Sequence, residues 1–272
     1  MTVRGSPWKA ILFLLPPCVI AAQQPGSSTW IDKVIAKHGT YLDKAEPMPC
    51  GPGDLDDEAR LRITALFEKV AAWPNFRAGH TMGTWAQDVA SCRVPMSGEQ
   101  CTKALEEAGV DFTPLGPVEG LETPVKLGTV INGVKLVCKE PSAMDCNLAL
   151  AVLRMTEVLS ALGVARVGVT SLSRPDSEFS FHSLGLAMDM NWFASTAWGG
   201  RAWVKTAFEK RKKHKTCGYE PASKKGKFLM DIACGLWEEK VFNTILTPNY
   251  NPGHTSHFHV DLRPGDNRFY LN

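Results

Sequence analysis

The chain lacks several patterns that would assign it to common functional classes. Its eight cysteines include no C-x-x-C pair, which argues against a cysteine-rich zinc knuckle. Its seven histidines include no H-E-x-x-H helix motif, so the glutamate base of that metalloprotease class is absent. The sequence contains neither an internal repeat nor a low-complexity tract. Any metal site must therefore use another arrangement of donors.

The chain also lacks a large net positive charge. Its formal net charge is +2, and both excess cations, Arg4 and Lys9, lie within the first 22 residues. Beyond that segment, 28 basic residues are balanced by 28 acidic residues. A balanced chain argues against dedicated nucleic-acid binding, so we expect no nucleic-acid partner.

The apolar run near the N-terminus is too short to span a bilayer comfortably. It covers residues 10–22, and Pro16 and Pro17 interrupt it. Basic residues precede the run, and small residues lie before a possible cleavage point ahead of Gln23. These features predict a signal peptide over residues 1–22, with an uncleaved anchor or a buried N-terminal helix as alternatives. We expect a periplasmic or secreted protein with no stable membrane insertion after cleavage.

The remaining length supports one large domain with an N-terminal extension. The chain has 272 residues with 44% hydrophobic content, enough for a sizeable core. We expect a linker or extension over residues 23–47 and a single domain over residues 48–272.

Cysteine usage fits export. Disulfide bonds in an oxidising compartment are the favoured interpretation. Seven cysteines follow Cys18, so one thiol is left over, and the sequence does not fix the pairing. Proximity along the chain favours three pairs: Cys92 with Cys101, Cys138 with Cys146, and Cys217 with Cys234.

Hydrophobic periodicity predicts a mixture of helices and strands. The Asn132-Gly133 dipeptide predicts the turn of a β-hairpin over residues 128–138. A β-branched segment over residues 165–172 predicts a strand. Helices are expected over residues 30–42, 55–70, 147–162 and 228–246, the last broken near Gly235.

A basic segment and a group of tryptophans each allow two interpretations. Residues 201–227 are rich in Lys and Arg, most densely over 210–215. We favour a solvated helix end for this segment over an anion-attracting rim. The tryptophans are more often core than substrate platform, although one lining a groove would suit a glycopeptide. They lie at positions 192, 198, 203 and 237.

The most informative feature is a pair of short motifs in the C-terminal half. The first runs from Ser180 to Asp189 as S-F-H-S-L-G-L-A-M-D, and the second runs from His254 to Asp261 as H-T-S-H-F-H-V-D. Together they contain four of the seven histidines. Imidazole and carboxylate are ligands that zinc prefers, and three such ligands with one open position form a catalytic rather than a structural site.

Strand alternation groups the donors of the second motif. In a strand over this segment, His257, His259 and Asp261 share one face, while Phe258 and Val260 point to the other. The polar face can then hold a metal while the apolar face enters the core.

The donors of the first motif need a different arrangement. His182 and Asp189 are seven residues apart, which fits one ligand on a loop and one on the strand that follows. Met188 and Met190 alternate with Asp189, as expected for a strand.

These motifs resemble a known group of proteins. The S-x-H-x-x-G-x-A-x-D string matches the signature of the zinc D-Ala-D-Ala peptidases and their relatives, of the lysostaphin/D-Ala-D-Ala-peptidase/hedgehog-type fold. The run T-P-N-Y-N-P-G-H-T-S-H-F-H-V-D, residues 247–261, more closely resembles the extensin-like C-terminal domain family. The resemblance is specific over residues 165–261 and faint before Cys138. Family members often carry Cys-Arg where Ser173-Arg174 stands here, which implies that Cys217 replaces the usual partner of Cys234.

The resemblance implies a fold and a zinc site. The fold would be α+β, with an antiparallel sheet that carries the zinc ligands, helices packed on one side, and disulfides. His182, Asp189 and His259 would bind Zn²⁺, and a water would fill the fourth position.

The resemblance also implies roles for the neighbouring residues. His257 would act as general base or as a donor to the developing oxyanion, and His254 could share that role. Arg174 would lie near the substrate carboxylate or oxyanion. Asp261 and Ser180 would orient the ligands or the loop.

Two functions from different classes follow from these expectations. The first is an exported zinc metallopeptidase that hydrolyses amide bonds in the stem or crosslink peptides of peptidoglycan. The second is a non-catalytic zinc-containing module that binds a cell-wall component or a protein. A side chain that closed the fourth metal position would favour the second. A purely structural metal is a third possibility, against which the presence of only three strong ligands argues.

Overall fold

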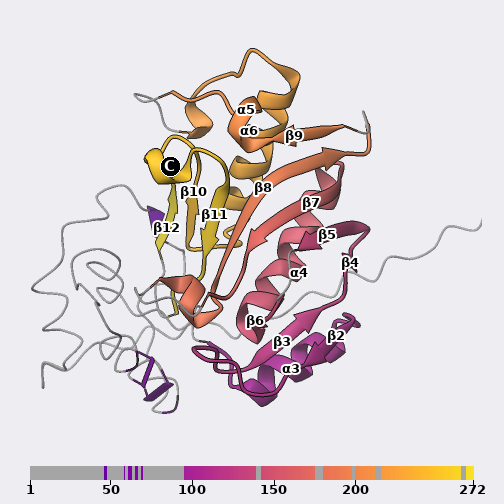
Figure 1. Cartoon of the computed structure of the whole chain (residues 1–272), viewed down its shortest axis with the longest axis vertical. Helices are drawn as coiled ribbons and strands as arrows, with labels where there is room; N and C mark the ends of the chain where they lie inside the picture. The colour runs from indigo at the N-terminus through magenta and orange to yellow at the C-terminus, as the bar shows by residue number, and fades with distance from the viewer. Residues whose placement is uncertain are drawn as a thin grey trace, which may run out of the picture.

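The computed structural model describes residues 46–47, 58, 61–62, 65–66, 69, 95–138, 142–174, 180–197, 200–211, 216–264 and 268–272. The expected signal peptide, the helix over 30–42 and Cys92 lie outside these ranges. The described residues of the expected helix over 55–70 are helical. The remaining elements are two sheets with helices against them (Figure 1).

In the described part of the chain, the large sheet has nine strands, in the order β1-β12-β10-β11-β8-β7-β5-β4, with β9 paired to β8. These strands are β1 (Glu46–Pro47), β4 (Val130–Ile131), β5 (Val134–Cys138), β7 (Val164–Ser171), β8 (Ala187–Ser195), β9 (Arg201–Trp203), β10 (Thr244–Leu246), β11 (Phe258–Asp261) and β12 (Arg268–Leu271). A small sheet has the order β2-β3-β6, formed by β2 (Phe112–Pro114), β3 (Pro124–Leu127) and β6 (Met144–Asp145).

The expectation of an antiparallel sheet is wrong for two of the strand pairs. β5 pairs with β7 in parallel, and β10 pairs with β12 in parallel, so the large sheet is mixed. The chain between β5 and β7 passes through helix α4 (Cys146–Ala161), and such a crossover returns the next strand in the same direction. The α+β class and the presence of disulfides are confirmed.

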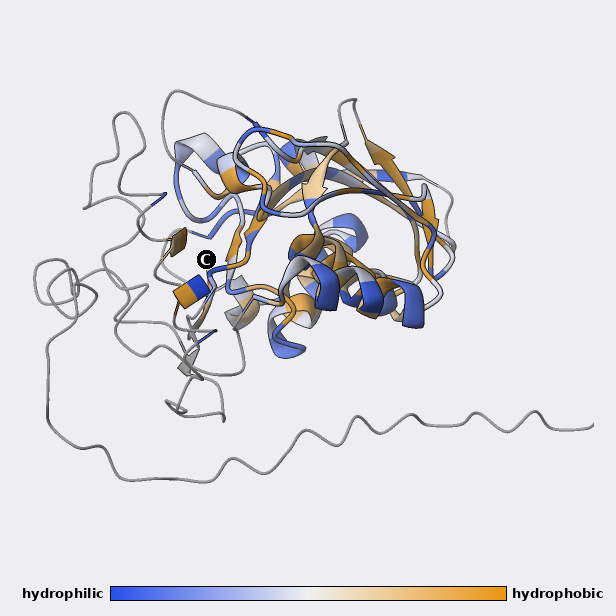
Figure 2. Ribbon diagram, turned by 90° about the horizontal axis from the view of Figure 1, so that it is seen from below, coloured by the Kyte–Doolittle hydropathy of each residue, from blue (hydrophilic) through white to orange (hydrophobic). Residues whose placement is uncertain are grey.

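The helices pack against one face of the large sheet, as expected. Helix α4 contacts β5 and β7, and helix α6 (Lys224–Glu238) contacts β9, β12 and α4. Figure 2 shows the helices beneath the curved sheet, with apolar residues between the two layers. A row of four cross-strand neighbours on β5, β7, β8 and β9 turns toward the helices, and each is at most 5% exposed: Leu136, Val167, Phe193 and Ala202. The opposite face of the sheet carries the polar motifs.

Local sequence signals account for the elements on which the site depends. Asn132 and Gly133 have φ angles of 49° and 77° and join β4 to β5, which confirms the expected hairpin. Asp145 caps α4 by accepting a hydrogen bond from the Asn147 N–H at 2.9 Å. Gly163, with a φ of +73°, follows the end of that helix.

The expected helix over residues 228–246 is wrong in its second half. Helix α6 runs unbroken through Gly235 and ends at Glu238, and the segment Thr244–Leu246 forms the inner strand β10. A Cβ on Gly235 would lie 3.2 Å from Leu162 Cδ1, so this glycine permits close packing beside α4 rather than a break.

Within the described residues, two disulfides link the helices to their surroundings. Cys101, on helix α3 (Gly98–Glu107), bonds to Cys146, and Cys217 bonds to Cys234. The second pair is confirmed, whereas the expected pairs of Cys101 with Cys92 and of Cys146 with Cys138 are wrong. Helix α3 packs on α4 and brings its cysteine to a Cα separation of 6.0 Å across 45 residues of sequence, so distance along the chain was a poor guide.

Both disulfides are consistent with export to an oxidising compartment. Among the residues described, no helix has the length and apolar character needed to cross a membrane. Of the basic segment, residues 212–215 lie outside the described ranges.

Gly168 gives a direct test of the sheet packing. An added Cβ would lie 2.0 Å from Trp192 Nε1, so Gly168→Ala must displace the indole from the neighbouring strand. We expect this change to lower the free energy of unfolding by about 1–3 kcal/mol in urea denaturation. The control is Gly116→Ala, because Gly116 has no atom within 4 Å of the added Cβ. Equal effects of the two substitutions would contradict the packing described.

Candidate metal centre

Strand pairing brings together two of the expected ligands. β8 and β11 are antiparallel, and Asp189 is the direct cross-strand partner of His259. Direct partners project from the same face with Cβ atoms about 5 Å apart. Phe258 and Val260, on either side of His259, are fully buried on the other face. The expected alternation in the second motif is therefore confirmed.

The third expected ligand comes from a separate turn. His182 lies in the short helix η2 (Phe181–Leu184), which ends at Gly185 in the left-handed conformation with φ of 65°. A Cβ at Gly185 would lie 2.8 Å from the Asp145 backbone nitrogen, so only glycine fits this close approach. The turn buries His182 to 1% exposure beside the ends of β7 and β8.

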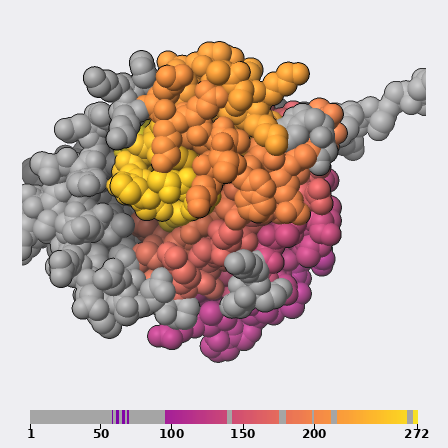
Figure 3. Space-filling view, turned by 45° about the horizontal axis from the view of Figure 1, so that its top comes forward, coloured from indigo at the N-terminus to yellow at the C-terminus, as the bar shows by residue number. Residues whose placement is uncertain are grey.

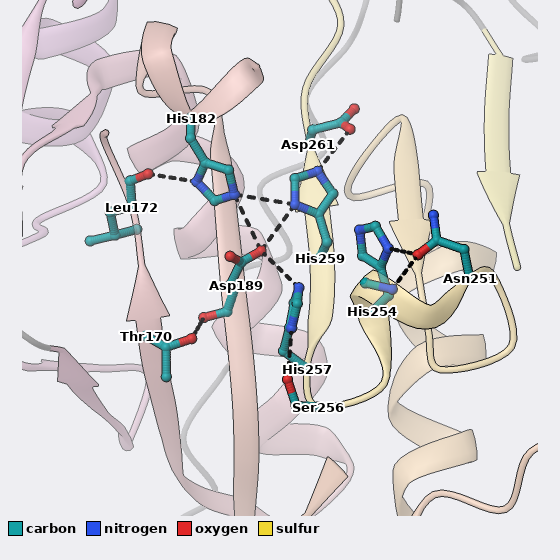
Figure 4. A network of polar contacts seen from close by, with 11 residues as sticks. Thr170, Leu172, His182, Asp189, Asn251, His254, Ser256, His257, His259 and Asp261 are labelled. Carbon is teal, nitrogen blue, oxygen red and sulfur yellow. Dashed lines mark hydrogen bonds and ion pairs between the residues drawn. The ribbon is translucent and has the colours of Figure 1, made fainter. Parts of the chain in front are cut away.

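Three donor atoms converge on one point (Figure 4). His182 Nε2 lies 3.2 Å from Asp189 Oδ1 and 3.2 Å from His259 Nδ1, and His259 Nδ1 lies 3.0 Å from Asp189 Oδ1. Ligands held at zinc bond lengths in a tetrahedral site lie roughly 3.3 Å apart. These side chains form a group that can hold a metal ion.

The nitrogen of each imidazole that faces away from Asp189 makes a hydrogen bond, and these two bonds orient the lone pairs of the other nitrogens toward the possible metal position. His182 Nδ1 lies 2.6 Å from the Leu172 carbonyl oxygen, which can only accept, so Nδ1 carries the hydrogen and Nε2 presents its lone pair. His259 Nε2 lies 3.2 Å from Asp261 Oδ2, and the same reasoning gives a lone pair at Nδ1. Two imidazole lone pairs and a carboxylate oxygen repel one another unless a cation or a proton lies between them. The donor set therefore fits a metal ion.

The Asp261 carboxylate is itself held in place. Arg263 Nε donates to Asp261 Oδ1 at 3.1 Å. Burial opposes ionisation of Asp261, but the Arg263 guanidinium and His259 hold the pKa of this carboxyl below its ordinary value. Asp261 is thus an anion that accepts from His259 and would make its ring a stronger ligand for a metal ion.

In the metal-free protein a proton takes the place of the cation. Burial opposes ionisation of Asp189, but its contacts with the His182 and His259 rings hold the pKa of this carboxyl well below its ordinary value. Hydrogen bonds to Asp189 and Asp261 overcome the burial of His259 and raise its pKa to about 9. His259 is therefore an imidazolium at neutral pH when no metal is bound.

His257 lies beside the three donors. Its Nε2 is 3.6 Å from Asp189 Oδ1, and its Nδ1 is 3.3 Å from Ser256 Oγ. Burial lowers the pKa of His257, the Asp189 carboxylate opposes this, and the charges of His259 and Arg174 add to the lowering. The ring is therefore neutral at physiological pH and can accept a proton.

His254 forms the outer wall of the site. It ends the short helix η4 (Pro252–His254), and its Nδ1 lies 2.8 Å from Asn251 Oδ1. Its ring centroid is 5.3 Å from that of His257 and 5.7 Å from that of His259. Burial and the neighbouring His259 and His257 lower the pKa of His254 to about 4.

Arg174 is tied through its backbone to the turn that carries His182. Its backbone N–H donates to the His182 carbonyl oxygen at 3.1 Å, and its side chain is exposed. Its charge makes a small contribution to the lowered pKa of His257. The structure thus brings together the side chains of five expected site residues, with Asp261 behind them, and ties the backbone of Arg174 to the His182 turn.

Sequence reasoning missed several groups that hold these residues. Asn251 could have been found, because Asn before Pro-Gly is typical of a side-chain-capped turn, and its Oδ1 accepts from the Gly253 N–H at 2.9 Å. Arg263 continues the alternation that already grouped His259 with Asp261. The Leu172 carbonyl oxygen carries no signal in the sequence, because any residue supplies one.

The orienting role of Asp261 is testable. Asp261→Asn removes the anion that fixes His259, and we expect metal affinity to fall about 10–100-fold in competition with a fluorescent chelator. Asp231→Asn is the matched control, because Asp231 is partly exposed on α6 and pairs with Lys227. Unchanged affinity in the Asp261 variant would contradict the geometry described.

The proton on His259 predicts a pH dependence of metal binding. Below pH about 9 the metal must displace this proton, so zinc binding should release about one proton per ion at neutral pH. Release should fall toward zero as the pH rises through that value. In the metal-free protein the raised pKa stabilises the fold below the unfolded pKa near 6.5, and this contribution is lost as the pH rises through about 9. Calorimetry of zinc binding in buffers of different ionisation enthalpy measures the number of protons released. If no proton were released at neutral pH, the protonated state assigned to His259 would be refuted.

Comparison with known proteins identifies a family whose matched region contains the candidate metal centre. No curated protein and no solved structure was found to match the chain. A family model, described as extensin-like protein C-terminus, matches residues 99–270, which is more than half of the chain and contains every residue of the candidate metal centre. The chain therefore belongs to the extensin-like protein C-terminus family.

Proposed function

We propose that this protein is an exported zinc metallopeptidase that hydrolyses amide bonds in the stem or crosslink peptides of peptidoglycan. The observation that carries the proposal is the convergence of His182 Nε2, Asp189 Oδ1 and His259 Nδ1, with His257 neutral at their side. The first motif also resembles the signature of zinc D-Ala-D-Ala peptidases, which supports both the metal and the substrate class. The disulfides and the apolar N-terminal segment support an extracytoplasmic site of action.

Zinc is the metal that we propose for this site. Two imidazoles and one carboxylate suit zinc, although the same donors occur at non-haem iron sites. When bound, zinc would acidify a water molecule and polarise the scissile carbonyl group. The resemblance of the first motif to zinc peptidases is the reason to favour zinc over iron.

His257 is the general base in this proposal. Its Nδ1 can donate to Ser256 Oγ, which leaves the Nε2 lone pair on the side of the three donors. Because its pKa is lowered, this nitrogen is free to accept a proton at neutral pH and can return it to the leaving amine. His254 is also neutral and lies farther out, where its Nε2 can accept a hydrogen bond from the substrate.

Arg174 supplies the positive charge of the site. Its side chain is exposed, and in this proposal its guanidinium donates to a substrate carboxylate or to the developing oxyanion. Because the turn that carries His182 accepts the Arg174 backbone N–H, this arginine and the first ligand are positioned together.

A non-catalytic metal-binding module remains the second candidate. The observation in its favour is that His257 Nε2 lies only 3.6 Å from Asp189 Oδ1, close enough to occupy the fourth metal position. A fourth protein ligand would close the site to substrate.

Substitution of His257 separates the two candidates. We expect His257→Ala to retain one metal ion per chain and to lose about 10²–10⁴-fold in turnover, because only a proton acceptor is removed. His182→Ala should lose the metal itself. Metal content by mass spectrometry and peptide release give the two readouts. Equal metal loss in both variants would identify His257 as a ligand and favour the binding module.

Digestion of purified peptidoglycan tests the activity directly. The mature protein loaded with zinc should release peptide fragments that mass spectrometry identifies, and a chelator should abolish the release. Restoration by zinc, but not by ferrous iron, is expected. The absence of metal-dependent cleavage of any wall peptide would remove the enzymatic proposal.

A further inference from the structure

A row of cations crosses the large sheet on the face away from the helices. The strand register places Lys135 beside Arg166, Arg166 beside Ala194, and Ala194 beside Arg201. The three cationic side chains are exposed. Strands β4, β5, β7 and β9 contain no Asp or Glu, and the acids of β8 and β11 on this face, Asp189 and Asp261, both belong to the metal centre. The face is therefore suited to an anionic partner.

A row of apolar side chains lies next to the cations on the same face. Val137, Gly168, Trp192 and Trp203 are successive cross-strand neighbours. The Trp192 indole covers Gly168, where a Cβ would lie 2.0 Å from its Nε1. Val137 is 39% exposed and Trp203 is 42% exposed, although both are large hydrophobic residues. Solvent thus reaches apolar and aromatic side chains beside a row of positive charge. Figure 3 shows that the orange segment of the chain, which includes β8 and β9, contributes to the surface of the molecule.

Arg201 joins the two rows. Its Cζ atom lies 4.4 Å from the ring centroid of Trp192 and 5.9 Å from that of Trp203. Within the described part of the chain, Arg201 makes no ion pair. The stacking holds the guanidinium plane in place while its N–H donors stay available to a ligand.

This face continues into the candidate metal centre. The register steps from Trp192 to Met190 opposite consecutive residues of β7, so Asn191 is a bulge that brings Trp192 and Asp189 to the same face. Three residues along a strand span about 10 Å. A ligand chain that runs parallel to β8, past Trp192 and its neighbour Trp203, would therefore reach the metal ligands.

We propose that this face binds the glycan strand of peptidoglycan and thereby presents the attached peptide to the metal centre. Sugar rings would stack on Trp203 through their C–H faces, as the exposed edge of the aromatic row allows. Carboxylates of the stem peptides would pair with Arg201, Arg166 and Lys135. The inference rests on the proposed function and extends it, since it assigns the part of the substrate that is not cleaved.

Sedimentation with purified peptidoglycan in the presence of a chelator tests the inference without any need for turnover. Trp203→Ala should weaken binding of the full-length mature protein about tenfold, and Arg201→Gln should weaken it several-fold and reduce its salt dependence. Trp203→Phe should retain most of the affinity, because a smaller ring still stacks. A melting temperature within about 2 °C of the wild type verifies each fold.

Two substitutions elsewhere on the surface serve as controls. Met96→Ala removes a 43% exposed hydrophobic side chain near α3, and Lys103→Gln removes an exposed cation on that helix. Neither should change the binding. Wild-type binding by the Trp203→Ala protein would overturn the inference, and so would equal binding to polygalacturonate, which carries carboxylates but no peptides.

The outcome can be separated from that of the proposed activity. Loss of binding in Trp203→Ala together with no cleavage by the wild type would support the docking face and reject the peptidase. Cleavage of intact peptidoglycan at equal kcat/KM by both proteins would support the peptidase and reject the docking face.

Discussion

The direct pairing of Asp189 with His259 across strands β8 and β11 is the constraint on which the candidate metal centre depends. Side chains alternate along a strand, so a slip of one residue would turn either donor into the core. The register is fixed from the other face, where Met190 and Phe258 are fully buried. The apolar half of each motif therefore stabilises the arrangement that its polar half needs.

Hydrogen bonds to the two imidazole rings then orient the nitrogen lone pairs toward Asp189. The Leu172 carbonyl oxygen and the Asp261 carboxylate each accept from the outer nitrogen of one imidazole, so both inner nitrogens present lone pairs to Asp189. Three such acceptors at about 3 Å from one another are stable only around positive charge. In the metal-free protein, the raised pKa of His259 and the lowered pKa of Asp189 show that positive charge is stabilised among these side chains.

The sequence predicted much of this site because its signals are local. Alternation placed His257, His259 and Asp261 on one face, and the seven-residue spacing correctly separated His182 on a turn from Asp189 on a strand. The hairpin at Asn132-Gly133 followed from its turn chemistry. What failed depended on tertiary packing. The pairing of Cys101 with Cys146 requires α3 to pack on α4, and the parallel strands require the crossover through α4.

The helix expected to reach residue 246 shows the same limit. Its apolar residues satisfy a helical period, yet Thr244–Leu246 is buried as strand β10 between β11 and β12. A short apolar run does not distinguish a buried strand from a buried helix, and only its neighbours in the fold decide. The burial of the tryptophans also depends on their neighbours in the fold. Trp192 and Trp203 are cross-strand partners, yet Trp192 is 6% exposed and Trp203 is 42% exposed.

Anomalous diffraction at the zinc absorption edge, from crystals of the zinc-loaded protein, tests the central claim most directly. One peak is expected at roughly 2.0–2.2 Å from His182 Nε2, from His259 Nδ1 and from an Asp189 carboxylate oxygen, with His257 outside bonding distance. The absence of a peak among these three side chains, or a peak bonded to His257 in place of His259, would contradict the account.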